Sequence, residues 1–218
     1  MRQLFMAPIF RRRRSTPAET LLPLLFGNVP VDEWPPSDEG DGMFVRARAA
    51  LRDGSKDAAV ELWRQLATNT DAAARDRLQA WTFLRANGVN PPVAIERDVF
   101  GVVVEVPVAA GRDVLASYDD GSCRYLNHAG AVVIGDAGFG NEVQDVIAEG
   151  ERLAGRVGTW DKPTLPELPP GHARVTLLTP GGLRFGQGPG DALLQDASAS
   201  PVFAASARLL ARIARSAP

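Results

Sequence analysis

The sequence predicts an α+β protein: an N-terminal helical hairpin and a third helix, then an antiparallel β-meander with helices packed on one face. Two changes of pattern support this fold class. Between residues 43 and 90 the apolar residues recur with the 3.6-residue spacing of amphipathic helices. From residue 99 the spacing shortens to two, as in strands, and tight-turn sequences separate the apolar runs. Short turns join antiparallel neighbours, so we expect a meander.

The composition divides the chain into three parts. Residues 1–42 hold a basic run, several prolines and an acidic cluster, so we expect an irregular arm. Residues 43–90 form the helical segment and residues 91–218 the α+β domain, either as separate units or as one continuous domain. One stretch of the arm is too apolar to remain in water, and we expect it to dock on the body or on a partner. With Trp34, the predicted partner-binding residues are Leu21, Leu22, Leu24, Leu25 and Phe26.

The helical segment is expected to begin with an antiparallel hairpin. Gly54 ends its first helix, Ser55 suits the N-cap of the second, and Trp63 lies on the apolar stripe of that second helix. A third helix is expected to begin near residues 70–71 and to end at Gly88, because glycine favours the left-handed conformation that follows a helix.

The segment ARAALRDGSKDAAVELWRQLA resembles the second half of a tetratricopeptide (TPR) repeat. It shares the glycine between the helices, the small Ala59, the aromatic Trp63 and Leu66. The resemblance covers one repeat, residues 39–72, and the first-helix positions that usually carry Trp, Leu and Gly are not matched. It implies a protein-binding surface, whereas a generic helical hairpin is the alternative for a single copy.

Three or four short strands are expected between residues 99 and 134, followed by a helix that Asn141 and Gln144 open as a capping box. Residues 160–171 form a proline-rich connector, which also has the spacing of a polyproline II ligand. A second hairpin and a final helix beginning at Ser200 complete the chain.

The composition argues against several classes of function. The formal charge of −2 does not suit a surface devoted to nucleic acid. Cys123 is the only cysteine and no carboxylate–histidine cluster has metal spacing, so we expect no disulfide, metal or cofactor. No apolar run is long enough to cross a membrane, and the basic N-terminal stretch lacks an export cleavage site. We therefore expect a cytoplasmic protein.

The best catalytic candidates surround residues 123–128. Cys123 and His128 could form a nucleophile and its base, but strand alternation sends them to opposite faces. A two-residue turn at 120–121 would register Asp113 opposite His128, an acid oriented toward an imidazole. The alternative is a structural or pH-sensitive ion pair. The candidate residues of this site are Asp113, Tyr125, Asn127 and His128.

Two glycine-rich segments could receive an anion. The first, residues 135–141, joins a strand to a helix, but its glycine order is not that of a phosphate-binding loop and Asp136 would repel an anion. The second, FGQGPGD, is expected to be a loop that receives a small anion or lies against a partner. A plain loop with positive-φ glycines is the alternative for both. The candidate residues of the second loop are Arg184, Gly186, Gly188 and Gly190.

These features favour a non-catalytic interaction protein, an adaptor or a small subunit of a larger assembly, with another protein or a second copy as its partner. The rival is a small enzyme or ligand-binding domain with its site near Asp113, His128 and the loop 186–190. Association with nucleic acid is a third possibility, which predicts salt-sensitive binding. It would act through Arg11, Arg12, Arg13 and Arg14.

Overall fold

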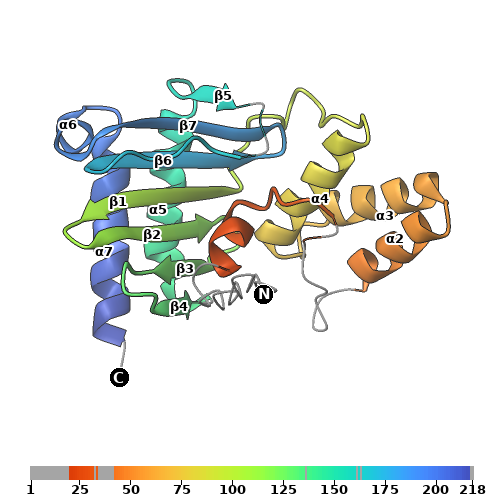
Figure 1. Cartoon of the computed structure of the whole chain (residues 1–218), viewed down its shortest axis with the longest axis horizontal. Helices are drawn as coiled ribbons and strands as arrows, with labels where there is room; N and C mark the ends of the chain where they lie inside the picture. The colour runs from red at the N-terminus through yellow and green to blue at the C-terminus, as the bar shows by residue number, and fades with distance from the viewer. Residues whose placement is uncertain are drawn as a thin grey trace, which may run out of the picture.

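The computed structural model describes residues 20–31, 33, 42–135, 137–160, 162 and 164–216. Helices precede an antiparallel sheet in the described part, so the predicted α+β class is confirmed (Figure 1). Trp34 and the four arginines at 11–14 lie outside the described residues. No helix of the described part is both long enough and apolar enough to cross a membrane.

Three α-helices follow one another between residues 43 and 86: α2 (Met43–Arg52), α3 (Lys56–Thr68) and α4 (Ala74–Ala86). Gly54, with φ +77°, lies in the turn between α2 and α3 as predicted. The start predicted for the third helix is wrong by about three residues, because the backbone N–H of Ala74 donates to Asp120 Oδ2 at 2.8 Å. A cap from a distant turn therefore sets where α4 begins.

Seven strands form one antiparallel sheet in the described part, in the order β4-β3-β2-β1-β6-β7-β5 (Figure 1). The edge strand β5 was not predicted: residues 158 and 159 lay between the expected helix and the connector, and residue 160 was placed at the start of the connector. The strands are β1 (Gly101–Val108), β2 (Gly111–Tyr118), β3 (Cys123–Leu126), β4 (Val132–Gly135), β5 (Gly158–Trp160), β6 (His172–Thr179) and β7 (Gly182–Pro189).

Two long helices, α5 (Gly140–Leu153) and α7 (Ser200–Ser216), cross the strands on one face of the sheet, and the short α6 (Gly190–Gln195) precedes α7 (Figure 1). They enclose a core with the inward residues of β1, β2 and β6.

The predicted capping box is wrong: a 3-10 turn, η2 (Ala137–Phe139), leads into α5, whose N-cap is Phe139. Gln144 instead donates to the carbonyl of Asp119 at 2.8 Å.

The apolar stretch of the arm docks on the opposite face. It forms a 3-10 helix, η1 (Leu22–Phe26), in which Leu25 is fully buried and accepts a 2.8 Å hydrogen bond from the Tyr118 hydroxyl. The Gln79 side-chain amide bonds both the N–H (3.3 Å) and the carbonyl (2.7 Å) of Val29. The apolar stretch was expected to dock either on the body or on a partner, and the structure shows it docked on the body of the chain.

The helical segment and the sheet share one hydrophobic cluster. It contains Trp81 and Leu84 of α4 together with Val103 and Val114 of the sheet. Residues 43–90 therefore pack directly on the α+β part of the chain.

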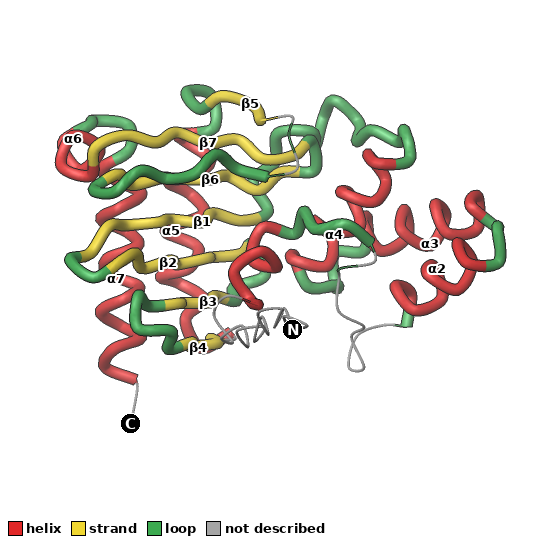
Figure 2. The backbone as a smooth tube through the Cα atoms, viewed as in Figure 1, coloured by secondary structure: helices red, strands yellow, loops and turns green. Residues whose placement is uncertain are grey.

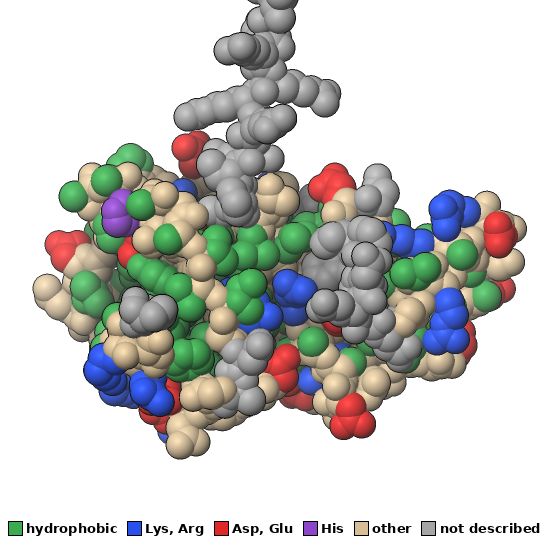
Figure 3. Space-filling view, turned by 90° about the horizontal axis from the view of Figure 1, so that it is seen from below, with side chains coloured by type: hydrophobic (Ala, Val, Ile, Leu, Met, Phe, Trp, Pro, Cys, Tyr) green, Lys and Arg blue, Asp and Glu red, His purple; other side chains and the backbone are tan. Residues whose placement is uncertain are grey.

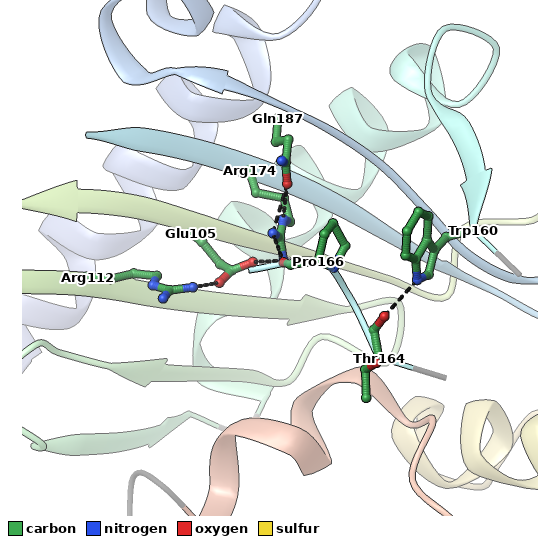
Figure 4. Close-up of polar contacts among 7 residues, drawn as sticks. All are labelled: Glu105, Arg112, Trp160, Thr164, Pro166, Arg174 and Gln187. Carbon is green, nitrogen blue, oxygen red and sulfur yellow. Dashed lines mark hydrogen bonds and ion pairs between the residues drawn. The ribbon is translucent and has the colours of Figure 1, made fainter. Parts of the chain in front are cut away.

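The connector between β5 and β6 crosses the remaining part of this face (Figure 2). Beneath it, Glu105 accepts from Arg112 at 2.6 Å and pairs with Arg174 at 3.3 Å (Figure 4). Arg174 also donates to Gln187 at 2.8 Å and to the carbonyl of Pro166. Burial lowers the pKa of Arg174, although the neighbouring Glu105 acts in the other direction. The connector thus covers a buried charge cluster on the sheet.

Candidate functional site

The register predicted for the β2–β3 hairpin is wrong by one residue. Ser117 pairs with Cys123, and the N–H of Tyr118 donates to the carbonyl of Ser122 at 3.0 Å. Residues 119–121 therefore form a three-residue loop, in which Gly121 adopts φ +82°. The shift places Asp113 level with position 127 instead of 128.

Asp113 and His128 nevertheless meet. Both the backbone N–H and ring Nδ1 of His128 lie 2.9 Å from Asp113 Oδ1, and the Tyr125 hydroxyl donates to Oδ2 at 2.7 Å. Asn127 has another role, because its Oδ1 accepts from the N–H groups of Ala129 (3.0 Å) and Ala131 (2.8 Å). It shapes the β3–β4 turn, which brings His128 back toward β2.

These contacts fix the protonation states of two members of the network. Burial opposes ionisation of the Asp113 carboxyl, but the hydrogen bonds from Tyr125 and His128 outweigh it and lower its pKa. Burial, together with the bond to ionised Asp113, raises the pKa of Tyr125 to about 12. Near neutral pH Asp113 is therefore a carboxylate and Tyr125 keeps its proton, which suits binding better than acid–base catalysis.

A pocket of about 170 Å³ opens beside Asp113, between the sheet and the helices α6 and α7. Asp113, Tyr125 and Ser206 are among its lining residues, but the surface of the pocket is almost wholly apolar. The Ser206 side chain belongs to a residue that is 3% exposed, and its Oγ has no hydrogen-bond partner. A hydroxyl without a base is no activated nucleophile. The apolar walls are formed by Val104, Val106, Leu115, Leu194, Phe203 and Leu210.

The Cys123–His128 pair is not assembled into one site. Cys123 is fully buried in the core beneath α5, whereas the His128 side chain is 38% exposed beyond the end of β3. The strand from Cys123 to Leu126 alone spans about 10 Å, at about 3.3 Å for each of its three residue steps. The separation that strand alternation predicted is therefore seen, although His128 lies in a turn.

The second glycine-rich segment is not a loop, so that prediction is wrong. Gly186 and Gly188 lie within β7 and Gly190 begins α6, and none of them has positive φ. Arg184 donates to the Thr159 hydroxyl (2.9 Å) and to the carbonyl of Val157 (3.0 Å). Its guanidinium therefore ties β5 and the turn before it to β7.

The helical hairpin keeps its TPR-like residues inside. Ala59, Trp63 and Leu66 are each at most 2% exposed. The Trp63 ring packs on Phe83 of α4 with centroids 5.2 Å apart. These positions therefore hold α3 against α4.

A second hollow, of about 410 Å³, lies between the β1–β2 turn and the connector. Prolines and glycines form part of its walls, and Arg112, Glu167 and His172 are its charged or titratable groups. Arg112 is already paired with Glu105. In the described part of the chain, no group of acidic, histidine or cysteine side chains could hold a metal ion.

Ser206 was not among the residues singled out from the sequence. Its position could have been noticed, because it has helical spacing with the inward residues Val202, Leu209 and Ile213.

No protein-family model matches the chain, and comparisons with curated proteins and with solved structures return no match. The geometry of the site therefore carries the functional argument.

Proposed function

We propose that this protein is a non-catalytic binding protein whose pocket beside Asp113 and Ser206 holds a small ligand with an apolar body. The apolar pocket itself carries the proposal, because side chains from the sheet, α6 and α7 leave a space between them instead of closing on one another. Protein interiors are close-packed and rarely leave voids larger than a water molecule. A bound molecule with an apolar body would fill this space.

The size of the pocket limits the ligand. A dry protein cavity of about 150 Å³ can hold a benzene ring, and this pocket measures about 170 Å³. A molecule of about eight heavy atoms fits, and it should bind with a Kd near the millimolar range. Leu194 at the rim is 60% exposed, so part of the apolar wall faces water without a ligand.

Ligand-observed NMR with benzyl alcohol tests this proposal in a matched pair of variants. Ala207 lines the pocket and is exposed, so Ala207→Trp should block the mouth and abolish saturable binding. Ala204 is exposed on the same helix but does not line the pocket, so Ala204→Trp should bind as the wild type does. Absence of binding to the wild type, or equal binding by Ala207→Trp, would refute the pocket.

The second candidate is the interaction protein, an adaptor or small subunit. Ile134 is 60% exposed on the edge strand β4, where an extended segment of a partner could add to the sheet. Figure 3 looks toward that edge and shows hydrophobic side chains spread across the face. The hairpin α2–α3 offers Val45, which is 47% exposed.

Co-purification from the native host at low salt tests this second candidate. Ile134→Asp or Val45→Asp should release a partner that uses the strand edge or the hairpin. Val93 is 88% exposed in the loop after α4, so Val93→Asp is the control and should retain the partner. If no partner is lost in any variant, neither surface forms the interface.

A further inference from the structure

The second hollow, between the β1–β2 turn and the connector, differs in chemistry from the apolar pocket beside Asp113. Its surface has polar and apolar parts of similar extent, and its volume of about 410 Å³ lies in the range of small-ligand sites. Arg112, near the start of β2, lines the hollow, and its side chain is 38% exposed. A charged donor group is therefore accessible at the wall of this hollow.

One contact orients the Arg112 guanidinium and leaves most of its donors free. Its Nη1 donates to Glu105 Oε1 at 2.6 Å, and Glu105 is the one acceptor recorded for Arg112 among the described residues. Glu105 is 2% exposed, so the guanidinium is held from the buried side. A guanidinium carries five N–H donors in a planar fork that matches the two oxygens of a carboxylate. The exposed side of Arg112 can therefore receive an anion.

The charge cluster around Arg112 has a surplus of positive charge. Arg112, Glu105 and Arg174 follow one another across β2, β1 and β6 (Figure 4). Two guanidinium groups thus share one carboxylate in the described part, and the hydrogen bonds of Arg174 go to the neutral oxygens of Gln187 and Pro166. Burial is the main cause that lowers the pKa of Arg174, and the charge of Arg112 adds to it. Since Arg174 is 3% exposed, an anion would meet this surplus charge at Arg112.

We propose that the second hollow binds a small organic carboxylate, whose charged group accepts from Arg112 and whose apolar part lies against the walls. A single surplus charge suits a monoanion better than a phosphate group, which carries about −1.5 to −2 near pH 7. The site goes beyond the proposed function, because the hollow shares no lining residue with the apolar pocket. The apolar side chains of its walls are Pro107, Val108, Leu168, Pro169 and Pro170.

Backbone contacts fix both walls of the hollow without a ligand. The β1–β2 hairpin keeps its strand pairing up to the turn at residues 109–110. On the other side, the N–H of His172 donates to the carbonyl of Pro169 at 3.1 Å, and the N–H of Gly190 donates to the carbonyl of Gly171 at 2.9 Å. A ligand that enters a preformed site orders few groups, so little of its binding free energy is lost.

Glu167 is the one acid among the lining residues, and its charge opposes an anion. Its side chain is exposed, so water and salt screen this charge. The Arg112 guanidinium is instead fixed by a buried partner and lies at the wall itself. Glu167→Gln should therefore strengthen carboxylate binding about twofold.

Backbone amide NMR of the full chain with benzoate and with benzyl alcohol tests the carboxylate site. Benzoate should shift the amides of Gly111, Arg112 and Gly171 saturably, with about tenfold higher affinity than benzyl alcohol shows at the same amides. Ala109 lines the hollow and is exposed, so Ala109→Trp should abolish these shifts. Ala110 is also exposed but does not line the hollow, so Ala110→Trp should keep them.

Two substitutions of Arg112 test the role of its charge and of its shape. Arg112→Gln should weaken benzoate about tenfold at these amides and change benzyl alcohol by less than about twofold. Arg112→Lys keeps a positive charge beside Glu105 but loses the planar fork, so its affinity for benzoate should lie between those of the wild type and Arg112→Gln. Because the wild-type comparison of the two ligands needs no variant, the proposal remains testable if Arg112→Gln does not fold.

The outcomes separate this site from the proposed function. Equal affinity of benzoate and benzyl alcohol at the three amides, or benzoate shifts that persist in Ala109→Trp, would overturn the carboxylate site. Inorganic phosphate that shifts the same amides at lower concentration than benzoate would overturn the ligand class. Each of these results leaves the apolar pocket standing, since binding of benzyl alcohol there is tested by Ala207→Trp.

Discussion

Replacing Ser206 with alanine should stabilise the ligand-free protein. The residue is 3% exposed and its hydroxyl has no partner, which costs the native state about 1–3 kcal/mol. Alanine also has the higher helix propensity, by about 0.5 kcal/mol. After allowance for local relaxation, we expect the free energy of unfolding to rise by about 1–2 kcal/mol. In a chain of this size each kcal/mol raises Tm by about 2–4 °C.

Urea unfolding followed by far-ultraviolet circular dichroism measures this change. Ser117 provides the matched control, because its hydroxyl is also buried and unpartnered but lies in β2 away from the pocket. Ser117→Ala should stabilise the protein as well, because it removes a buried hydroxyl of the same kind. A loss of about 1 kcal/mol or more in Ser206→Ala would show that the native hydroxyl is bonded, and the reasoning would fail.

Three further changes test other parts of the account. Leu25→Ala should lower the free energy of unfolding by about 2–5 kcal/mol, measured in urea, because the side chain is fully buried between η1 and the body. Tyr125→Phe removes a 2.7 Å hydrogen bond and should raise the pKa of Asp113, observed by carboxyl carbon NMR. Stability from Asp113 is present above its unfolded pKa of about 3.9 and is lost as pH falls through the lower folded pKa. That acid-side loss should therefore shrink in Tyr125→Phe, as measured by unfolding at several pH values. Arg174→Met should destabilise the protein by about 3 kcal/mol in the same urea assay, because buried Glu105 loses one of its two cations.

Local patterns predicted most of the elements. The hairpin turn at Gly54 and the strands of the meander follow from residues that are neighbours in the sequence. The edge strand β5 could not be found in this way, because its three residues become a strand only by pairing with residues 183–185 of β7. The start of α4 likewise depends on Asp120, a residue 46 positions away.

The site was predicted only in part, for related reasons. The contact between Asp113 and His128 was expected, but from a register that the three-residue loop shifts by one position. The Asx turn at Asn127 restores the contact. The pocket itself needs Leu194 of α6 and Ser206 of α7, which reach β2 only after the chain has folded. Spacing along the sequence carries no information about that approach.

Backbone amide NMR mapping of benzyl alcohol binding tests the central claim most directly. The account predicts saturable shifts in Asp113, Tyr125, Leu194 and Ser206, which line one pocket although they are up to 93 positions apart. It also predicts that these shifts disappear in Ala207→Trp and persist in Ala204→Trp. Shifts confined to other surfaces, or no saturable shifts at the four residues, would contradict the claim that this pocket is the binding site.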